Sequence, residues 1–144
     1  MEFSHRQNAR SGLESGLFCL VDRTQPKHSA YVQAIRTLNQ PLITTWPCLT
    51  EAMYLALTRG GWTMQKKLGH LLTDGLLSIY DIQSVDYVRL LQLMEKYRDL
   101  PMDLADATLV LAAENTRLTQ IFTLDSDFLI YRIHGRQPFD IIDV

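Results

Sequence analysis

The amino-acid sequence predicts an α/β domain. Short apolar runs rich in β-branched residues alternate along the chain with longer runs in which apolar residues recur at helical spacing. Gly, Pro and Asn stand at the joints between these runs, where they favour turns and chain reversals. Strands that alternate with helices in this way are typical of α/β architecture.

Length and composition indicate one self-sufficient domain. The chain has 144 residues, of which 47% are hydrophobic and 21% charged, so a core is expected without disulfides or a structural metal. Cys19 and Cys48 lie in apolar surroundings and are expected to be small buried residues. The net charge of −2 lacks the basic excess of many nucleic-acid-binding domains, so any such binding must be local.

The sequence gives no sign of a membrane protein. No apolar run approaches the ~20 residues that a membrane-spanning helix needs. The first residues carry charges and lack the apolar stretch of a signal peptide. We therefore expect a cytoplasmic protein without membrane contact.

The first half of the chain alternates between helix and strand. Helices are expected over residues 28–38, 47–59 and 62–72, and strands over 41–45 and 76–82. Residues 41–45 are short and β-branched, as buried strands are, and Pro47 suits the first turn of the helix that follows. Gly60 and Gly61 should end that helix.

The second half continues the same pattern. Ser84 is a suitable N-cap for a helix that runs to about Tyr97, and another helix should run from Asp103 to about Arg117. Strands are expected over 121–124 and 139–144, the last of them at a sheet edge.

Acidic residues recur where predicted strands end and predicted helices begin. Glu51 lies in the first turns of a helix, Asp103 and Asp106 open another, and Asp125 and Asp127 follow a strand. In open parallel sheets these positions converge on one crevice. Carboxylates brought within ~4 Å repel by about 4 kcal/mol per pair, which either a bound cation or protonation of some of them relieves. Oxygen ligands of this kind favour Mg²⁺ or Mn²⁺ over zinc.

Other interpretations of these residues stay open. An Asp at a helix start is also an ordinary cap and partner of the helix dipole. Arg132 and Arg136 follow the last acids closely and either hold phosphate or belong to a surface loop of mixed charge. The motifs of serine hydrolases, P-loop proteins, dinucleotide-binding domains and zinc proteases are absent from the sequence.

Four stretches of the sequence resemble a known family. They are PKHSAYVQAIRTL, PLITTWPCLTEAMYL, DLPMDLADATLVLAAE and FTLDSDFLIYRIHGRQPFDII. In this order and spacing they resemble PIN-domain ribonucleases, and among these the VapC-type toxins of bacterial toxin–antitoxin pairs. The resemblance implies a PIN-like three-layer fold with a mostly parallel central sheet flanked by helices. It covers residues 17–144 and leaves 1–16 as a polar N-terminal segment.

The resemblance also implies an activity and its residues. Proteins of this kind cleave RNA with one or two Mg²⁺ or Mn²⁺ ions held by a quartet of acids. The motifs assign Glu51, Asp106 and Asp125 to three places of the quartet. Thr123 would help to fix the loop, and Asp103 and Asp127 would be supporting acids. A cognate antitoxin and a homodimer are the implied protein partners.

The first acid of the quartet has two candidate positions. One deletion relative to the family pattern places Glu14 there, one methylene longer than the usual Asp. An interpretation without the family instead takes residues 17–21 as the first strand and Asp22 as its exit acid. If neither residue serves, the domain is a catalytically degenerate PIN domain that acts as a protein- or RNA-binding module.

Overall fold

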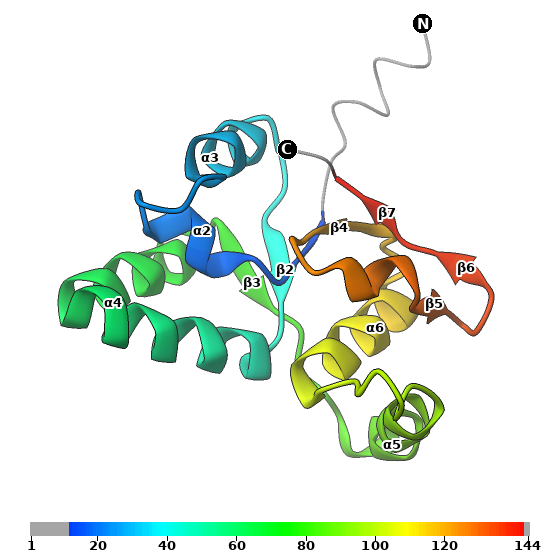
Figure 1. The fold of residues 1–144 in the computed structure, drawn as a ribbon. Helices are drawn as coiled ribbons and strands as arrows, with labels where there is room; N and C mark the ends of the chain where they lie inside the picture. The colour runs from blue at the N-terminus through cyan, green and yellow to red at the C-terminus, as the bar shows by residue number, and fades with distance from the viewer. Residues whose placement is uncertain (1–11, 143–144) are drawn as a thin grey trace, which may run out of the picture.

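A computed structural model describes residues 12–142 of the chain. Its centre is a five-stranded sheet in which every neighbouring pair of strands is parallel, in the order β3-β2-β1-β4-β7 (Figure 1). The strands are β1 (Leu13–Glu14), β2 (Leu42–Thr44), β3 (Leu77–Ile79), β4 (Gln120–Phe122) and β7 (Asp140–Ile141). The predicted parallel sheet is therefore confirmed, and its last strand lies at an edge as expected.

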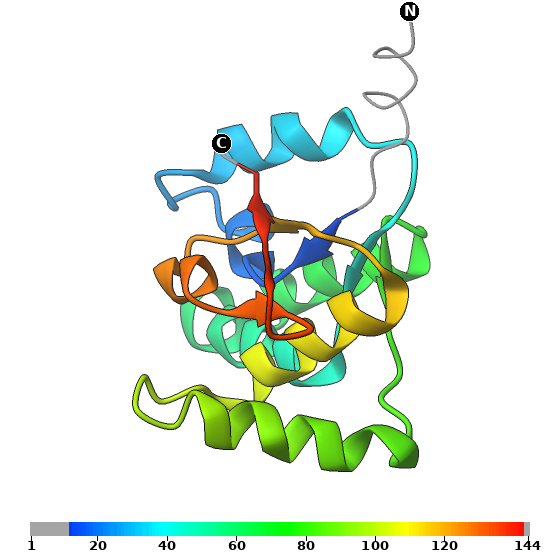
Figure 2. The same ribbon diagram turned by 90° about the vertical axis from the view of Figure 1, so that its right-hand side faces the viewer.

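Helices cover both faces of this sheet. They are α2 (Leu17–Val21), α3 (His28–Arg36), α4 (Trp46–Thr73), α5 (Tyr87–Lys96) and α6 (Leu104–Thr116), with short 3₁₀ helices η1 (Ser84–Asp86) and η2 (Ser126–Leu129). One apolar core joins α2, α3 and α4 to the sheet, and a second core joins α5 and α6 to it. Figure 2 shows α3 and α5 on opposite sides of the sheet. The three-layer arrangement is confirmed.

The glycine pair after Arg59 interrupts α4 as predicted. Gly61 has φ +65° and ψ −157°, a conformation that L side chains rarely adopt, so the ribbon labelled α4 consists of two helices joined by a kink. The helix before the kink runs from the end of β2, and the helix after it returns the chain to the start of β3.

The interpretation of residues 17–21 as the first strand is wrong, because they form α2. The central strand is β1, which pairs with both β2 and β4. The residues on either side of β1 extend this pairing: the Ser15 N–H donates to the Phe122 carbonyl, and the Gly12 carbonyl accepts from the Ile43 N–H. The resemblance places the start of the domain at residue 17, but β1 precedes that residue and belongs to the central sheet. Residues 1–11, the greater part of the predicted polar segment, lie outside the described residues.

A half-buried ion pair ties α5, α6 and a C-terminal hairpin together. Arg89 donates to both carboxylate oxygens of Glu114, from Nε at 2.9 Å and from Nη2 at 2.8 Å. The backbone N–H of His134 donates to the same Glu114 carboxylate at 2.8 Å. His134 lies between strands β5 (Arg132–Ile133) and β6 (Gln137–Pro138) of an antiparallel hairpin that the sequence patterns did not predict.

None of the helices within residues 12–142 has the length and apolar character that a membrane crossing needs.

Candidate active site

The carboxyl ends of β1, β2 and β4 open into one cavity of about 260 Å³. Its acidic lining residues are Glu51, Asp103, Asp106 and Asp125. Its other lining residues are Ser15, Gly16, Phe18, Cys48, Ala52, Leu55, Ala105, Thr123 and Leu124. The structure thus brings together four of the five acids that the sequence placed at strand exits and helix starts, and no Lys or Arg of residues 12–142 lines this cavity.

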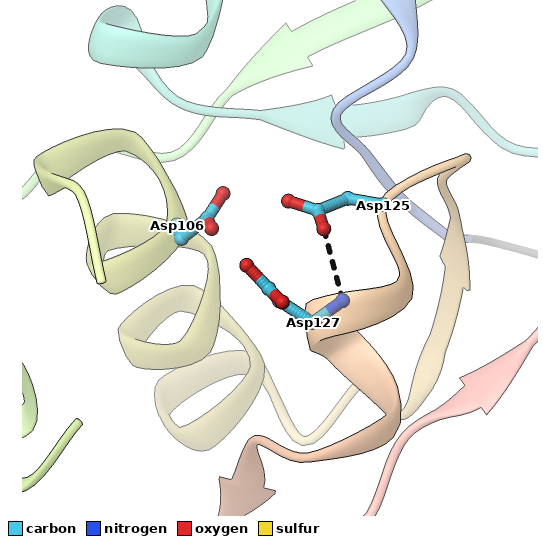
Figure 3. A group of neighbouring side chains, drawn as sticks. All are labelled: Asp106, Asp125 and Asp127. Atoms are coloured by element: carbon cyan, nitrogen blue, oxygen red, sulfur yellow. Dashed lines mark hydrogen bonds between the residues drawn. The ribbon is translucent and has the colours of Figure 1, made fainter. Parts of the chain in front are cut away.

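The carboxylates of Asp106, Asp125 and Asp127 lie closest to one another, and we call these three residues the Asp cluster. One oxygen of each lies within 4.8 Å of the others. Figure 3 shows Asp106 on α6 facing the two other carboxylates, which come from the segment after β4. Oxygens at this separation can bind one cation together, and hard cations such as Mg²⁺ take ligands of this type.

Two neighbours fix the position of Asp106. Asp103 is the N-cap of α6, and its Oδ1 accepts a hydrogen bond from the Asp106 N–H at 2.8 Å. The hydroxyl of Tyr131, a fully buried side chain, donates to Asp106 Oδ2 at 3.0 Å. Neither the spacing of the sequence nor the resemblance singled out Tyr131, because it lies far from Asp106 along the chain.

The environment of Asp106 makes its negative charge costly. Burial and the neighbouring Asp103 charge raise the pKa of Asp106 to about 7, although the hydrogen bond from Tyr131 opposes this rise. The charges of Asp125 and Glu51 add to the same effect. A bound cation would offset this cost, because it favours the ionised carboxylate.

Thr123 links the ends of two neighbouring strands. Its Oγ1 accepts hydrogen bonds from Ser15 Oγ at 2.8 Å and from the Asp125 N–H at 3.0 Å. Asp125 Oδ1 in turn accepts from the Asp127 N–H at 2.9 Å. This series of bonds holds the segment after β4 against the end of β1.

Glu51 lies on α4 and lines the cavity outside the Asp cluster. Its side chain is exposed, and partial burial together with the Asp103 charge raises its pKa. Cys48, one turn earlier on the same helix, is buried with its thiol 3.6 Å from the Ala105 carbonyl. Burial raises the pKa of this thiol to about 11, so Cys48 is a packing residue rather than a nucleophile.

Glu14, the first candidate for the remaining acid, ends β1 at the centre of the sheet. It is completely buried, and its Oε1 accepts a hydrogen bond from the Gly16 N–H. Its Oε2 has no hydrogen-bond partner among the described residues, and burial holds its pKa well above the usual range. A Cβ at Gly16 would lie 2.9 Å from the Tyr31 hydroxyl and 3.1 Å from Glu14 Oε1, so a larger residue here would force one of these buried side chains to shift.

Asp22, the second candidate, follows α2 and binds within its own loop. Its carboxylate accepts hydrogen bonds from the Thr24 N–H, the Thr24 hydroxyl and the Gln25 amide at 2.7–3.1 Å. These bonds, the Thr24 hydroxyl foremost, hold the pKa of Asp22 below its usual value. Neither Asp22 nor Glu14 belongs to the lining of the cavity or to the Asp cluster. The strand on which the case for Asp22 depended is absent, since residues 17–21 are helical.

The two arginines with a predicted phosphate contact lie in the C-terminal hairpin. Arg132 uses Nη1 to bind three main-chain carbonyls, those of Leu129, Ile130 and Tyr131. Arg136 is exposed beside the turn between β5 and β6. Neither residue lines the cavity, so the structure does not bring them to the acids.

The parallel sheet and the acids at its carboxyl edge define a PIN-like α/β domain. No protein-family model matches the chain. Ribonuclease VapC26 of Mycobacterium tuberculosis is 26% identical to it over 129 residues, which cover 89% of this chain and 96% of that protein. The crystal structure of M. tuberculosis VapC20, a Sarcin-Ricin loop cleaving toxin, superposes with a TM-score of 0.76 at 12% identity, covering 90% of this chain and 100% of that one. The resemblance of this chain to the VapC-type PIN domains is thereby confirmed, in its sequence by the first protein and in its fold by the second.

Proposed function

We propose that this protein is a metal-dependent endoribonuclease that hydrolyses RNA phosphodiester bonds as the toxin of a type II toxin–antitoxin system. The observation that carries the proposal is the Asp cluster, with its carboxylate oxygens within 4.8 Å of one another at the carboxyl edge of the sheet. A sequence relative that is a ribonuclease supports the same activity.

We assign Mg²⁺ or Mn²⁺ as the metal. The ligand atoms that the Asp cluster offers are carboxylate oxygens, which suit these ions better than they suit zinc. The pKa of Asp106, raised to about 7, indicates a site in which the ionised carboxylate would be stabilised by a bound cation. When bound by the Asp cluster, such an ion would lower the pKa of a water, polarise the scissile phosphate and stabilise charge on the leaving oxygen.

The chain's own residues position the reacting groups. Asp103 and Tyr131 fix Asp106 from two sides, and Thr123 fixes the backbone of Asp125. Glu51 adds a further carboxylate to the wall of the cavity. No side-chain nucleophile is required, because water is the attacking group in hydrolysis of this kind.

For the first acid we favour Glu14 over Asp22. Glu14 directly precedes Ser15, whose hydroxyl binds the Thr123 side chain at the cavity wall. One of its carboxylate oxygens has no partner among residues 12–142, whereas both oxygens of Asp22 accept hydrogen bonds in their own loop. The Glu14 side chain would have to leave its contact with Gly16 to reach an ion.

We also propose a cognate antitoxin, an RNA substrate and a homodimer as partners, with the cytoplasm as the place of action. The dimer is supported by large apolar side chains on the outer face of α4, where Trp46 is 55% and Tyr54 66% exposed. Light scattering after gel filtration should give twice the mass of the chain, and Tyr54→Ser should shift this mass toward the monomer.

The activity is tested by incubating the purified protein with labelled RNA in Mg²⁺, Mn²⁺ or EDTA. Cleavage should require the metal and should fall by orders of magnitude in Asp106→Asn and Asp125→Asn. Asp74→Asn is the matched control, because Asp74 is an exposed residue at the end of α4 and does not line the cavity. If the wild type cuts no RNA with either metal, the domain is a degenerate PIN fold and the proposed activity is wrong.

A further inference from the structure

The cavity poses an electrostatic problem for an RNA substrate. Its lining contains acids but no Lys or Arg from the described part of the chain. Metal ions would neutralise the scissile phosphate, but the neighbouring phosphates of the strand also need positive partners. A basic side chain at the rim of the cavity would supply one.

Three basic side chains elsewhere in the fold already have partners. Arg89 binds both oxygens of Glu114, and Arg132 binds three main-chain carbonyls of its own loop. Lys96 lies over the Tyr97 ring at the end of α5. None of these three residues lines the cavity.

Arg59 continues the helix face that forms one wall of the cavity. Glu51 and Leu55 line the cavity from α4, and Arg59 follows at the next i+4 position of the same stripe. Eight residues of α-helix span about 12 Å, so Arg59 begins some two turns beyond Glu51. Its side chain is exposed.

The guanidinium of Arg59 is held in place by an aromatic ring. Its central carbon lies 5.6 Å from the centroid of the Phe18 ring, and Phe18 itself lines the cavity. A guanidinium over a ring keeps its N–H groups free for hydrogen bonding. Within residues 12–142 no hydrogen bond or ion pair uses these groups, although the charge of Arg59 also acts on nearby Asp22.

We propose that Arg59, stacked on Phe18 at the rim of the cavity, binds a phosphate of the RNA strand next to the scissile phosphate. The inference rests on the proposed ribonuclease function and adds a substrate-binding subsite to it. Arginine is suited to this task because its planar fork can donate two hydrogen bonds to one phosphate. Phe18 is the platform that orients the fork, and Arg59 does not contact the reacting bond.

The test is the salt dependence of RNA binding. Fluorescence anisotropy of an end-labelled, unstructured RNA in Ca²⁺ gives the dissociation constant at several salt concentrations, and a gel afterwards shows that the RNA is uncut. Each phosphate contact contributes about 0.7 to the slope of log affinity against log salt for a single strand. Arg59→Gln should therefore reduce the slope by about 0.7 and weaken binding several-fold at low salt.

Three further variants make the result specific. Arg36→Gln is the matched control and should behave as the wild type, because Arg36 is exposed at the end of α3 and lines a different cavity at the starts of β2 and β3. Arg59→Lys should keep the slope but lose part of the affinity, since a lysine cannot form the fork. Phe18→Leu should also keep the slope and lose affinity, because Arg59 is no longer held.

The outcomes separate the subsite from the activity. If the wild type cleaves RNA and Arg59→Gln leaves the slope unchanged, the subsite is wrong and the ribonuclease stands. If Phe18→Leu leaves the affinity unchanged, the platform is wrong. A wild type that neither binds nor cuts RNA overturns both proposals, whereas equal losses in Arg59→Gln and Arg36→Gln reduce the effect to overall charge and overturn the subsite.

Discussion

Replacing Asp106 by Asn removes one negative charge from the Asp cluster and keeps the shape of the side chain. The Asn side-chain oxygen can still accept the hydrogen bond that Tyr131 donates to Asp106 Oδ2. The backbone N–H that Asp103 caps is unchanged. The substitution therefore isolates the effect of charge on the stability of the metal-free protein.

The expected magnitude follows from the pKa of Asp106, which is about 7 in the folded protein against a usual value of 3.8. As the pH rises from about 4 to 7, the unfolded chain loses this proton first, so the folded state holds more protons and its stability falls. At 1.36 kcal/mol per pKa unit the full difference is about 4 kcal/mol. Solvent in the cavity screens a half-buried group, so we expect about 1–2 kcal/mol.

Thermal unfolding followed by circular dichroism in EDTA measures this difference. Near pH 8, Asp106→Asn should raise the midpoint by roughly 3–8 °C over the wild type. As the pH falls to about 4, where the unfolded chain also holds this proton, the two midpoints should converge. Saturating Mg²⁺ should reverse the order at pH 8, because the metal stabilises the wild type by mass action. A variant that is less stable at both pH values would refute this reasoning and show that the fold needs the carboxylate itself.

Four other substitutions examine single residues. Tyr131→Phe should weaken Mg²⁺ binding about ten-fold by calorimetry while the fold persists, since the hydroxyl orients a ligand; unchanged affinity would exclude this role. Glu114→Gln should lower the free energy of unfolding in urea by about 2–3 kcal/mol, because Arg89 loses its charged partner. The loss stays below that of a fully buried pair because Arg89 is 35% exposed. A loss below about 0.5 kcal/mol would mean that water replaces the pair. Glu14→Gln should reduce RNA cleavage by orders of magnitude and Asp22→Asn should change it little, and the opposite order would make Asp22 the first acid.

Local sequence signals predicted most of the elements that build the cavity. The β-branched stretch 41–45 contains β2, and Pro47 stands at the start of α4 as expected. Gly61 breaks α4, and Asp103 caps α6. Each of these signals acts over a few residues, so it can be recognised without knowledge of the fold. Strand exits and helix starts then converge by the geometry of a parallel sheet.

The features that local signals did not predict depend on contacts between distant parts of the chain. A five-residue apolar run such as 17–21 fits a buried strand or a short helix equally well, and only the pairing of β1 with β2 and β4 decides between them. The bond from Tyr131 to Asp106 joins residues on two elements, and no spacing rule connects them. The direction of the Glu14 side chain depends on the Gly16 turn, which the sequence alone does not reveal.

The burial of α6 limits which substitutions this helix can tolerate. Ala107, Ala112 and Ala113 are completely buried there, and Val110 and Leu109 fill the remaining space. Larger side chains at the alanine positions would overpack the core, typically at a cost of about 1–3 kcal/mol each. A substitution library of this chain should therefore recover few variants within α6 and many on exposed helix faces. Asp106 thus stands on an element with little freedom to vary, which would keep the proposed metal-binding carboxylate in register while the exposed surface changes.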